Sequence, residues 1–410
     1  MLRLFVFAVF LLCLFGCGEG TRQASNFTTS EIESLHLDST KLLCADVSAV
    51  KRVNLNSFLG DKEFEFGDKV QSLHFIPLET TDDGLLANIY KVVLTDDYIY
   101  VHDAFKGGGL AIFTSKGKFV RRISHGGGPG ELYRLSDLAF DSVTNRLLAY
   151  QHPFLLFYTP DGKYLEQKKM PFGFYNFYPM PGGYVFKTID GMGNQHLGSK
   201  QPCTFLVTDT TFRLRQAALP VPADKTHFGG YCYLYGSGGN IQVTGKFNDT
   251  IYSYNPLCHA LHAAYVLDYS DKKLPDSYVE DPRGRFTDIL MQNDYYYFLG
   301  EYLETISHQA FFLRNDWRGH RLVVYRDKHT GGMSGGATYH FDYHLLPPVG
   351  FPKATYKDCF VSLHYPSPQD SCLQASSLIS AEDKRVITGL TADDNPVLVL
   401  FRMKSIEAHE

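Results

Sequence analysis

The 410-residue sequence lacks several features that would assign it to a familiar functional class. It has a single Trp, and none of its eight Cys form a Cys-x-x-Cys pair, so zinc-ribbon and thioredoxin-like sites are without support. Its 39 Lys and Arg against 44 Asp and Glu give a net charge of −5, which argues against a nucleic-acid partner. No apolar run reaches the roughly 20 residues that span a membrane.

Aromatic residues and turn formers are abundant instead. The chain has 27 Tyr and 31 Phe, which favour strands because their bulk packs well on a pleated surface. It also has 36 Gly and 19 Pro, which suit a fold with many turns. This composition favours an all-β protein with a large core.

The N-terminus carries a targeting signal. Arg3 precedes the apolar run Leu4–Phe15, which has the length and flanks of a secretory signal. The run ends in Leu14-Phe15-Gly16-Cys17, which resembles a bacterial lipobox, although Phe15 is larger than that pattern prefers. We predict a signal peptide over residues 1–16 and a lipid on Cys17 that holds the protein on the outer membrane, facing the periplasm or the surface. An ordinary secretory signal with an incidental Cys is the alternative.

A repeat recurs along the chain. Ile112–Phe119 and Phe157–Tyr164, 45 residues apart, share an aromatic residue, Thr, Gly, Lys and a second aromatic residue. Less regular copies follow at Phe205–Phe212, Ile251–Pro256 and Leu322–Gly331. A period of about 40–50 residues with four short strands per unit is typical of a β-propeller, in which each blade buries its faces against its neighbours.

The strand pattern sets the predicted domain limits. Four strands of one antiparallel sheet are predicted between Ile89 and Ile123, and Ser367–Leu390 reads as a helical insertion near the C-terminus. We predict a tether and lead-in over residues 17–63, followed by one propeller domain over residues 64–405.

Five features together resemble one group of proteins. They are Cys17 of the lipobox, Phe75–Thr80, Gly127–Glu131, Phe247–Tyr252 and Asp394–Leu400. The chain is similar in these to the six-bladed β-propeller lipoproteins of Bacteroidetes, a family described as a domain of unknown function. The resemblance implies four-stranded antiparallel blades and a strand from one terminus that completes the blade of the other. Val70–Leu78 and Val397–Met403 are the candidates for this closure. It implies no settled activity.

The Gly-rich stretch 126–131 is the first candidate site. It is not a phosphate-binding P-loop, because no Lys-Ser/Thr pair follows it and the next element is a strand. A tight crossing between two blades is the simpler interpretation. Such crossings open onto one face of a propeller, so His125, Glu131 and Arg134 are predicted to line a ligand pocket there.

Two further patterns resemble catalytic or metal sites. His340, Asp342 and His344 share one face of a predicted strand and include the ligand types of a divalent metal. Same-face neighbours are about 6.6–7 Å apart, so a solvated strand face is the alternative. Gly332–Gly336 matches Gly-x-Ser-x-Gly, but a strand is predicted to follow where a nucleophile elbow has a helix, so we interpret it as a Gly-rich turn.

No catalytic motif stands in its required context. We therefore predict a lipid-anchored binding or scaffold module for a glycan, a peptide or a partner protein, without a cofactor. The alternative is a hydrolase or lyase that acts on a polysaccharide or lactone at the mouth of the central channel. Clustered inward carboxylates with His would favour the enzyme, and a channel lined by Tyr, Ser and Asn would favour the binding module.

Overall fold

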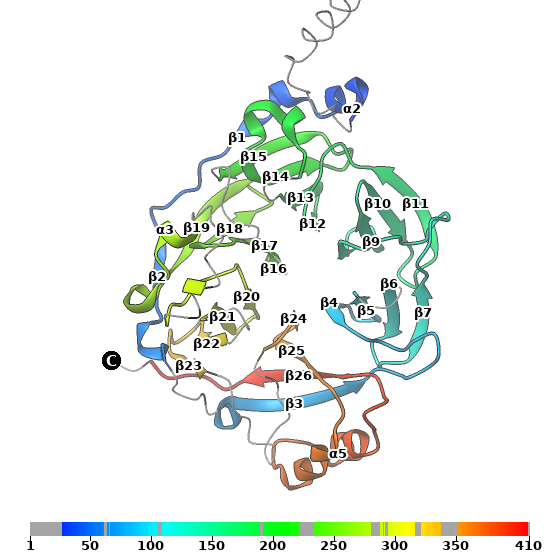
Figure 1. The fold of residues 1–410 in the computed structure, drawn as a ribbon, viewed down its shortest axis with the longest axis vertical. Helices are drawn as coiled ribbons and strands as arrows, with labels where there is room; N and C mark the ends of the chain where they lie inside the picture. The colour runs from blue at the N-terminus through cyan, green and yellow to red at the C-terminus, as the bar shows by residue number, and fades with distance from the viewer. Residues whose placement is uncertain are drawn as a thin grey trace, which may run out of the picture.

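The chain forms a ring of sheets around a central axis. The computed structural model describes residues 27–60, 64, 66–104, 109–188, 192–221, 233–279, 288–289, 291, 294–315, 321–337, 349 and 351–408. Their strands form six sheets that follow one another around the axis (Figure 1). The all-β, six-bladed propeller with four-stranded antiparallel blades is thus confirmed.

In blades 1 to 5 the strands run from the axis outward in chain order. Blade 1 contains β4 (Ile89–Leu94), β5 (Tyr98–Asp103), β6 (Gly109–Thr114) and β7 (Phe119–Ile123). Blade 2 contains β8 (Asp137–Asp141), β9 (Arg146–Gln151), β10 (Phe154–Tyr158) and β11 (Tyr164–Lys169). Blade 3 contains β12 (Asn176–Met180), β13 (Gly183–Lys187), β14 (Cys203–Asp209) and β15 (Leu214–Pro220).

The remaining blades complete the ring. Blade 4 contains β16 (Leu234–Ser237), β17 (Asn240–Gly245), β18 (Asn248–Asn255) and β19 (Ala260–Asp268). Blade 5 contains β20 (Tyr302–Glu304), β21 (His308–Arg314), β22 (Arg321–Asp327) and β23 (Met333–Ala337). Blade 6 contains β24 (Ala354–Tyr356), β25 (Cys359–His364), β26 (Val397–Met403) and β3 (Val70–Pro77).

The repeated Gly of the sequence pattern lies at equivalent turns. Gly117 joins β6 to β7 with φ +82°, and Gly162 joins β10 to β11 with φ +84°. A residue with a Cβ is strained in this left-handed region, whereas Gly is not. The conserved spacing between the two copies therefore marks the same hairpin in successive blades.

Blade 6 closes the ring by pairing the two ends of the propeller. The N-terminal strand β3 pairs antiparallel with the C-terminal strand β26, with Phe75 opposite Val399 (Figure 1). The predicted closure by Val70–Leu78 and Val397–Met403 is confirmed. Because β26 also pairs with β25, the last strand of the chain lies between two others and cannot leave without breaking both ladders.

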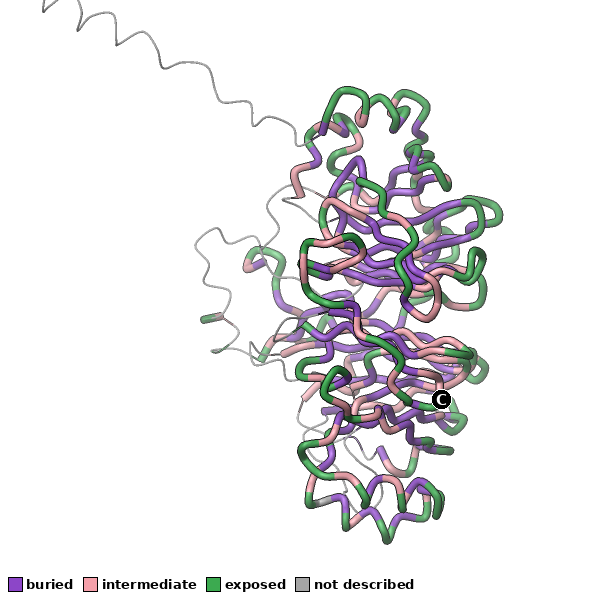
Figure 2. Tube along the Cα trace, turned by 90° about the vertical axis from the view of Figure 1, so that its right-hand side faces the viewer, coloured by how far each residue is buried: buried purple, intermediate pink, exposed green. Residues whose placement is uncertain are grey.

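Apolar side chains fill the space between neighbouring blades. Between blades 5 and 6, Phe401 packs against Phe360 at a ring-centroid distance of 5.5 Å and against Phe66 at 5.3 Å. Tyr325 of β22 contacts the same cluster, and all four rings are buried. Figure 2, a view turned by 90°, shows buried residues along the strands and exposed residues at many of the outer turns. Full burial of one such ring stabilises the fold by about 1.5–3 kcal/mol.

The N-terminal lead-in packs along the outer rim. After α2 (Thr29–Ser34) and η1 (Leu37–Ser39), β1 (Lys41–Leu42) pairs in parallel with β15, and β2 (Lys51–Asn54) pairs in parallel with β19. Two short helices, η2 (Asn56–Phe58) and η3 (Gly67–Lys69), lead on to β3. The segment that the sequence presents as a tether and lead-in is thus attached to the propeller from Phe27 onward, as a strap across blades 3 and 4.

The remaining helices lie outside the blades. The predicted insertion holds η6 (Pro368–Ala375) and α5 (Ala381–Thr388), and Asp383 of α5 accepts a hydrogen bond from the N–H of Phe75 in β3. Short helices η4 (Gln195–Lys200), η5 (Ser270–Lys272) and α3 (Asp276–Val279) occupy connections. In the part of the chain that the structure describes, no helix is long and apolar enough to cross a membrane.

The interpretation of Gly332–Gly336 as a turn was wrong. Met333–Ala337 form β23, the outer strand of blade 5, paired with β22. A Cβ at Gly335 would lie 2.3 Å from the carbonyl oxygen of Val323, so Gly is needed there for close approach between strands. The high Gly content led to the prediction of a turn, because turns are also rich in Gly.

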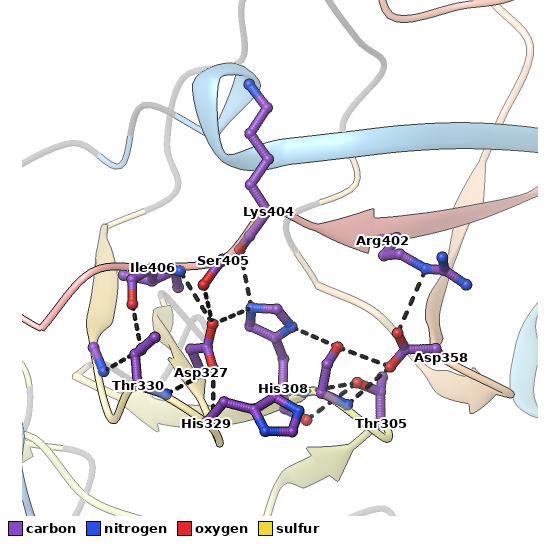
Figure 3. Close-up of polar contacts among 12 residues, drawn as sticks. Thr305, His308, Asp327, His329, Thr330, Asp358, Arg402, Lys404, Ser405 and Ile406 are labelled. Carbon is purple, nitrogen blue, oxygen red and sulfur yellow. Dashed lines mark hydrogen bonds and ion pairs between the residues drawn. The ribbon is translucent and has the colours of Figure 1, made fainter.

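A latch holds the C-terminal tail against blade 5 (Figure 3). The buried carboxylate of Asp327 accepts hydrogen bonds from the Ser405 hydroxyl at 2.7 Å and the Ile406 N–H at 3.2 Å through one oxygen. Its other oxygen accepts the N–H groups of His329 and Thr330. Burial alone would raise the pKa of Asp327, but these hydrogen bonds outweigh it and lower the pKa to about 2.

The substitution Asp327→Asn should weaken the latch, because Asn has one carbonyl oxygen in place of two acceptors. We expect a loss of about 1–3 kcal/mol in the free energy of unfolding at pH 7. The unfolded carboxyl titrates near pH ~3.9. The advantage of the wild type should therefore be complete above that pH and shrink as the pH falls toward 2.

Urea unfolding of both proteins between pH 2.5 and 7 measures this difference. Asp97→Asn, at an exposed hairpin tip, is the matched control and should change stability by less than about 0.5 kcal/mol. A difference between wild type and Asp327→Asn that does not change with pH would contradict the latch.

Candidate functional site: a pocket on the crossing face

A cavity of about 600 Å³ opens on one face of the propeller. This is the crossing face, defined by the segments 124–136 and 170–175 that lead from one blade to the next. The walls come from blades 1 and 2 and from the crossing to blade 3. The lining residues are Tyr90, His102, Asp103, Ala104, Gly109, His125, Leu132, Tyr133, Arg134, Leu135, Ser136, Tyr150, His152, Phe174, Tyr175 and Met192.

The structure brings two of the three predicted ligand-binding residues together. His125 and Arg134 both line the cavity, and both come from the crossing segment between β7 and β8. Glu131 is not among the lining residues, and its carboxylate accepts a hydrogen bond from the N–H of Gly128 at 2.8 Å. Glu131 therefore holds the Gly-rich crossing in shape, and ligand binding by His125 and Arg134 stays a prediction.

Aromatic rings form much of the wall. Tyr133 is 71% exposed at the mouth, and its ring centroid lies 5.6 Å from that of His125. Deeper in, Phe174 stacks on Tyr150 with centroids 3.7 Å apart. Tyr175 shares a hydrogen bond of 3.1 Å with a second lining hydroxyl, that of Tyr90. The exposed ring of Tyr133 is thus available to a ligand, while the stacked Phe174 and Tyr150 are buried and support the wall.

His102 is the unusual residue of the pocket. It is 5% exposed at the end of β5, and its Nδ1 atom is buried without a hydrogen-bond partner. No side-chain hydrogen bond of His102 is present among the described residues. Its pKa is lowered to about 4, mainly because burial disfavours the charged form; Lys91 adds to this effect, and Asp137 and Asp103 oppose it. The imidazole is therefore neutral at pH 7, with one donor and one acceptor.

The carboxylates around the pocket are already paired. Asp103 accepts N–H groups of Ala87 and Asn88 and lies 3.6 Å from Arg122. Asp137 is fully buried and forms an ion pair of 2.7 Å with Lys91. Arg134, in contrast, is exposed and forms no ion pair with any described residue. The positive charge at the pocket mouth is therefore available to a ligand.

The other predicted sites fall outside the described residues. This holds for Cys17 and for the metal candidates His340, Asp342 and His344. Among the residues that the structure does describe, no group of three or more His, Cys, Asp or Glu is placed to hold a metal ion. Both the lipid site and the metal site stay predictions.

A Ser, His and Asp occur together at the latch (Figure 3). Ser307 Oγ lies 2.8 Å from His308 Nδ1, but Ser307 also contacts Asp358 at 2.8 Å. His308 Nε2 faces the carbonyl oxygen of Lys404 at 3.0 Å and lies 3.8 Å from Asp327. A catalytic triad needs the Asp hydrogen-bonded to the imidazole and the Ser free to attack. Here the groups fasten the tail instead.

Comparison with known proteins shows the family. The model of a domain of unknown function, DUF4934, matches residues 50–402, which run from just before β2 to the penultimate residue of β26. The chain belongs to this family. The resemblance expected from the sequence is thereby confirmed. Comparison with curated proteins finds no match.

One solved structure shares the fold of this DUF4934 chain, and others match it less well. A Bacteroides fragilis structure named "Putative exported protein" has a TM-score of 0.71 at 18% identity, and covers 87% of this chain and 100% of its own. A Bacteroides caccae protein of unknown function has a TM-score of 0.36 at 11% identity, covering 62% and 87%. The extracellular domain of a Bacteroides thetaiotaomicron protein has a TM-score of 0.35 at 12% identity, covering 73% and 37%. The Bacteroides fragilis structure supports the fold of this chain, and at 18% identity it supports nothing beyond the fold.

The chemistry of the DUF4934 pocket suits binding. It offers the exposed ring of Tyr133, a neutral imidazole and one guanidinium without an ion pair to any described residue, while the lining Asp103 and the neighbouring Asp137 are held by protein partners. Sequence reasoning found His125 and Arg134 because they flank a Gly-rich crossing. It missed His102 and Tyr90 in strands and Tyr175 in the next crossing, because the sequence does not show which side chains from different blades lie together.

Proposed function

We propose that this chain is an exported binding module that holds a glycan in the crossing-face pocket. The observation that carries this proposal is the aromatic-lined cavity of about 600 Å³. Pockets for small ligands measure roughly 300–1,000 Å³ and combine apolar walls with a few polar groups. A protein partner would instead need a contact surface of about 800 Å².

The wall chemistry favours a sugar over other small ligands. A pyranose ring has C–H faces that carry partial positive charge, and the faces of Tyr rings carry partial negative charge. Its hydroxyl groups both donate and accept hydrogen bonds, as do Tyr90, Tyr175 and neutral His102. Tyr133, exposed at the mouth, provides a platform on which a sugar ring can stack.

A hydrolase or lyase acting on a polysaccharide or lactone is less well supported. Such chemistry usually uses two carboxyl groups on either side of the scissile bond. The two carboxylates near this pocket, Asp103 and Asp137, have Arg122 and Lys91 beside them and accept backbone N–H groups. They are thereby held in structural roles.

The substitution Tyr133→Ala tests the binding proposal. Because Tyr133 is mostly exposed, its loss should leave folding unchanged and weaken glycan binding roughly tenfold through the lost ring contact. Leu257→Ala, at a turn on the opposite face and 84% exposed, is the control and should bind as the wild type does.

The measurement is a glycan-array screen of the mature protein followed by calorimetry with the glycans that bind. Failure of the wild type to bind any glycan would overturn the proposal. Release of shortened products from a bound polysaccharide would favour the hydrolase or lyase.

We further propose that a lipid on Cys17 holds the protein on the outer membrane. The first described residue, Phe27, packs at the rim of the crossing face, with its ring 4.4 Å from that of His196 and Lys169 above it. The segment from Cys17 to Phe27 reaches at most about 35 Å when extended. The propeller would therefore stay close to the bilayer, with its pocket face on the side where the tether leaves.

The substitution Cys17→Ser should abolish lipidation and move the protein from the membrane fraction to the soluble fraction. Metabolic labelling with a palmitate analogue and fractionation of cells measure both effects. Cys258→Ser, at an exposed turn, is the matched control and should remain labelled and membrane-bound. Labelling of the Cys17→Ser protein would contradict the anchor.

A further inference from the structure

Resting on the glycan-binding function proposed above, we propose that the pocket is specific for acidic glycans. In this arrangement Arg134 binds the carboxylate of a uronic acid residue, and His102 binds a hydroxyl group of the same or the adjoining sugar. Tyr133 lies next to Arg134 in the chain and supports the sugar ring at the mouth.

The charge balance of the pocket points to an anion. Two carboxylates, Asp103 and Asp137, lie near the cavity, and each has a cation beside it, Arg122 and Lys91. Arg134 adds a further positive charge that no described residue neutralises. The planar guanidinium matches a carboxylate with two parallel hydrogen bonds, which gives orientation as well as affinity.

The buried imidazole is a second observation that points to a polar ligand. A polar atom buried without a partner destabilises a fold by about 1–3 kcal/mol, and most such atoms in native proteins are satisfied. Nδ1 of His102 is such an atom, in the wall of the same cavity that holds Arg134. Residues that break packing rules without a local gain are expected at functional sites.

The two groups are placed for different tasks. His102 comes from β5 and is held on one side by the ring of Tyr90, with centroids 5.1 Å apart. Arg134 comes from the crossing segment at the mouth, where its side chain is exposed. A rigid neutral group in the wall and a charged group at the entrance suit a ring with one anionic substituent and several hydroxyl groups.

Calorimetry with matched oligosaccharides tests the charge preference. The probes are oligogalacturonate, the same oligosaccharide with its carboxylates methyl-esterified, and a sulfated galactan. We expect the wild type to bind oligogalacturonate at least roughly tenfold more tightly than its methyl ester, which corresponds to about 1.4 kcal/mol. The Arg134→Gln substitution should remove this difference, whereas Arg213→Gln, an exposed arginine at a turn on the opposite face, should retain it.

The outcomes separate the two proposals. Equal binding of the acid and its ester would overturn the acidic specificity and leave the glycan-binding function intact. Stronger binding of the sulfated galactan would replace the carboxylate with a sulfate as the anion and overturn the uronic acid. Absence of binding to these probes and to every other glycan would overturn both proposals.

The His102→Phe substitution tests the role of the imidazole. Phe keeps a ring of similar size and removes both nitrogen atoms, so the melting temperature should stay the same or rise, while affinity for oligogalacturonate falls roughly tenfold. If His102 had only a structural role, the substitution would lower the melting temperature and leave the affinity unchanged. That result would overturn the proposal that His102 binds a sugar hydroxyl. His102→Gln, which keeps a donor and an acceptor, should recover part of the affinity.

Discussion

The pairing of β3 with β26 is the contact on which the rest of the structure depends. A propeller blade cannot bury both faces unless the ring is complete, and here the ring is completed by strands more than 300 residues apart in sequence. We call this pair of strands the seam. The N-terminal lead-in runs directly into β3, the latch at Asp327 holds the residues that follow β26, and Asp383 of the helical insertion contacts β3. The latch and the helical insertion, two elements outside the repeat, are therefore attached to the strands that close the ring, whereas β1 and β2 of the lead-in pair with blades 3 and 4.

The pocket lies in blades 1 and 2, of which blade 1 packs directly against blade 6, and several side chains at its mouth come from the crossing segments between blades. Strands of blades 1 and 2 provide a rigid wall, and the crossing segments provide Tyr133, Arg134 and Tyr175. Among the described residues, buried His102 has no side-chain hydrogen bond and exposed Arg134 has no ion pair, while the neighbouring charges are paired. A closed ring with a large interblade core can tolerate an unsatisfied imidazole that a smaller domain could not.

The sequence predicted the fold well because the relevant signals are local and repeated. The Gly117 and Gly162 hairpins, the aromatic strands and the terminal strands all follow from short-range patterns. The site was predicted in part. Crossing residues such as Arg134 can be located from a Gly-rich turn, but the partners of Glu131 and the isolation of His102 depend on packing between blades. The strand at Met333–Ala337 was missed because its Gly residues serve close strand contact.

Closure at blade 6 stabilises the whole ring, including blade 2 of the pocket wall, which does not border blade 6. Amide hydrogen exchange of a Phe401→Ala variant tests this stabilisation most directly, because Phe401 is fully buried at the seam. We expect the free energy of unfolding to fall by about 3–5 kcal/mol. Protection against hydrogen exchange should fall by the same amount for the slowest amides of β9 and of β26. A fall confined to blade 6, with β9 unchanged, would contradict this expectation.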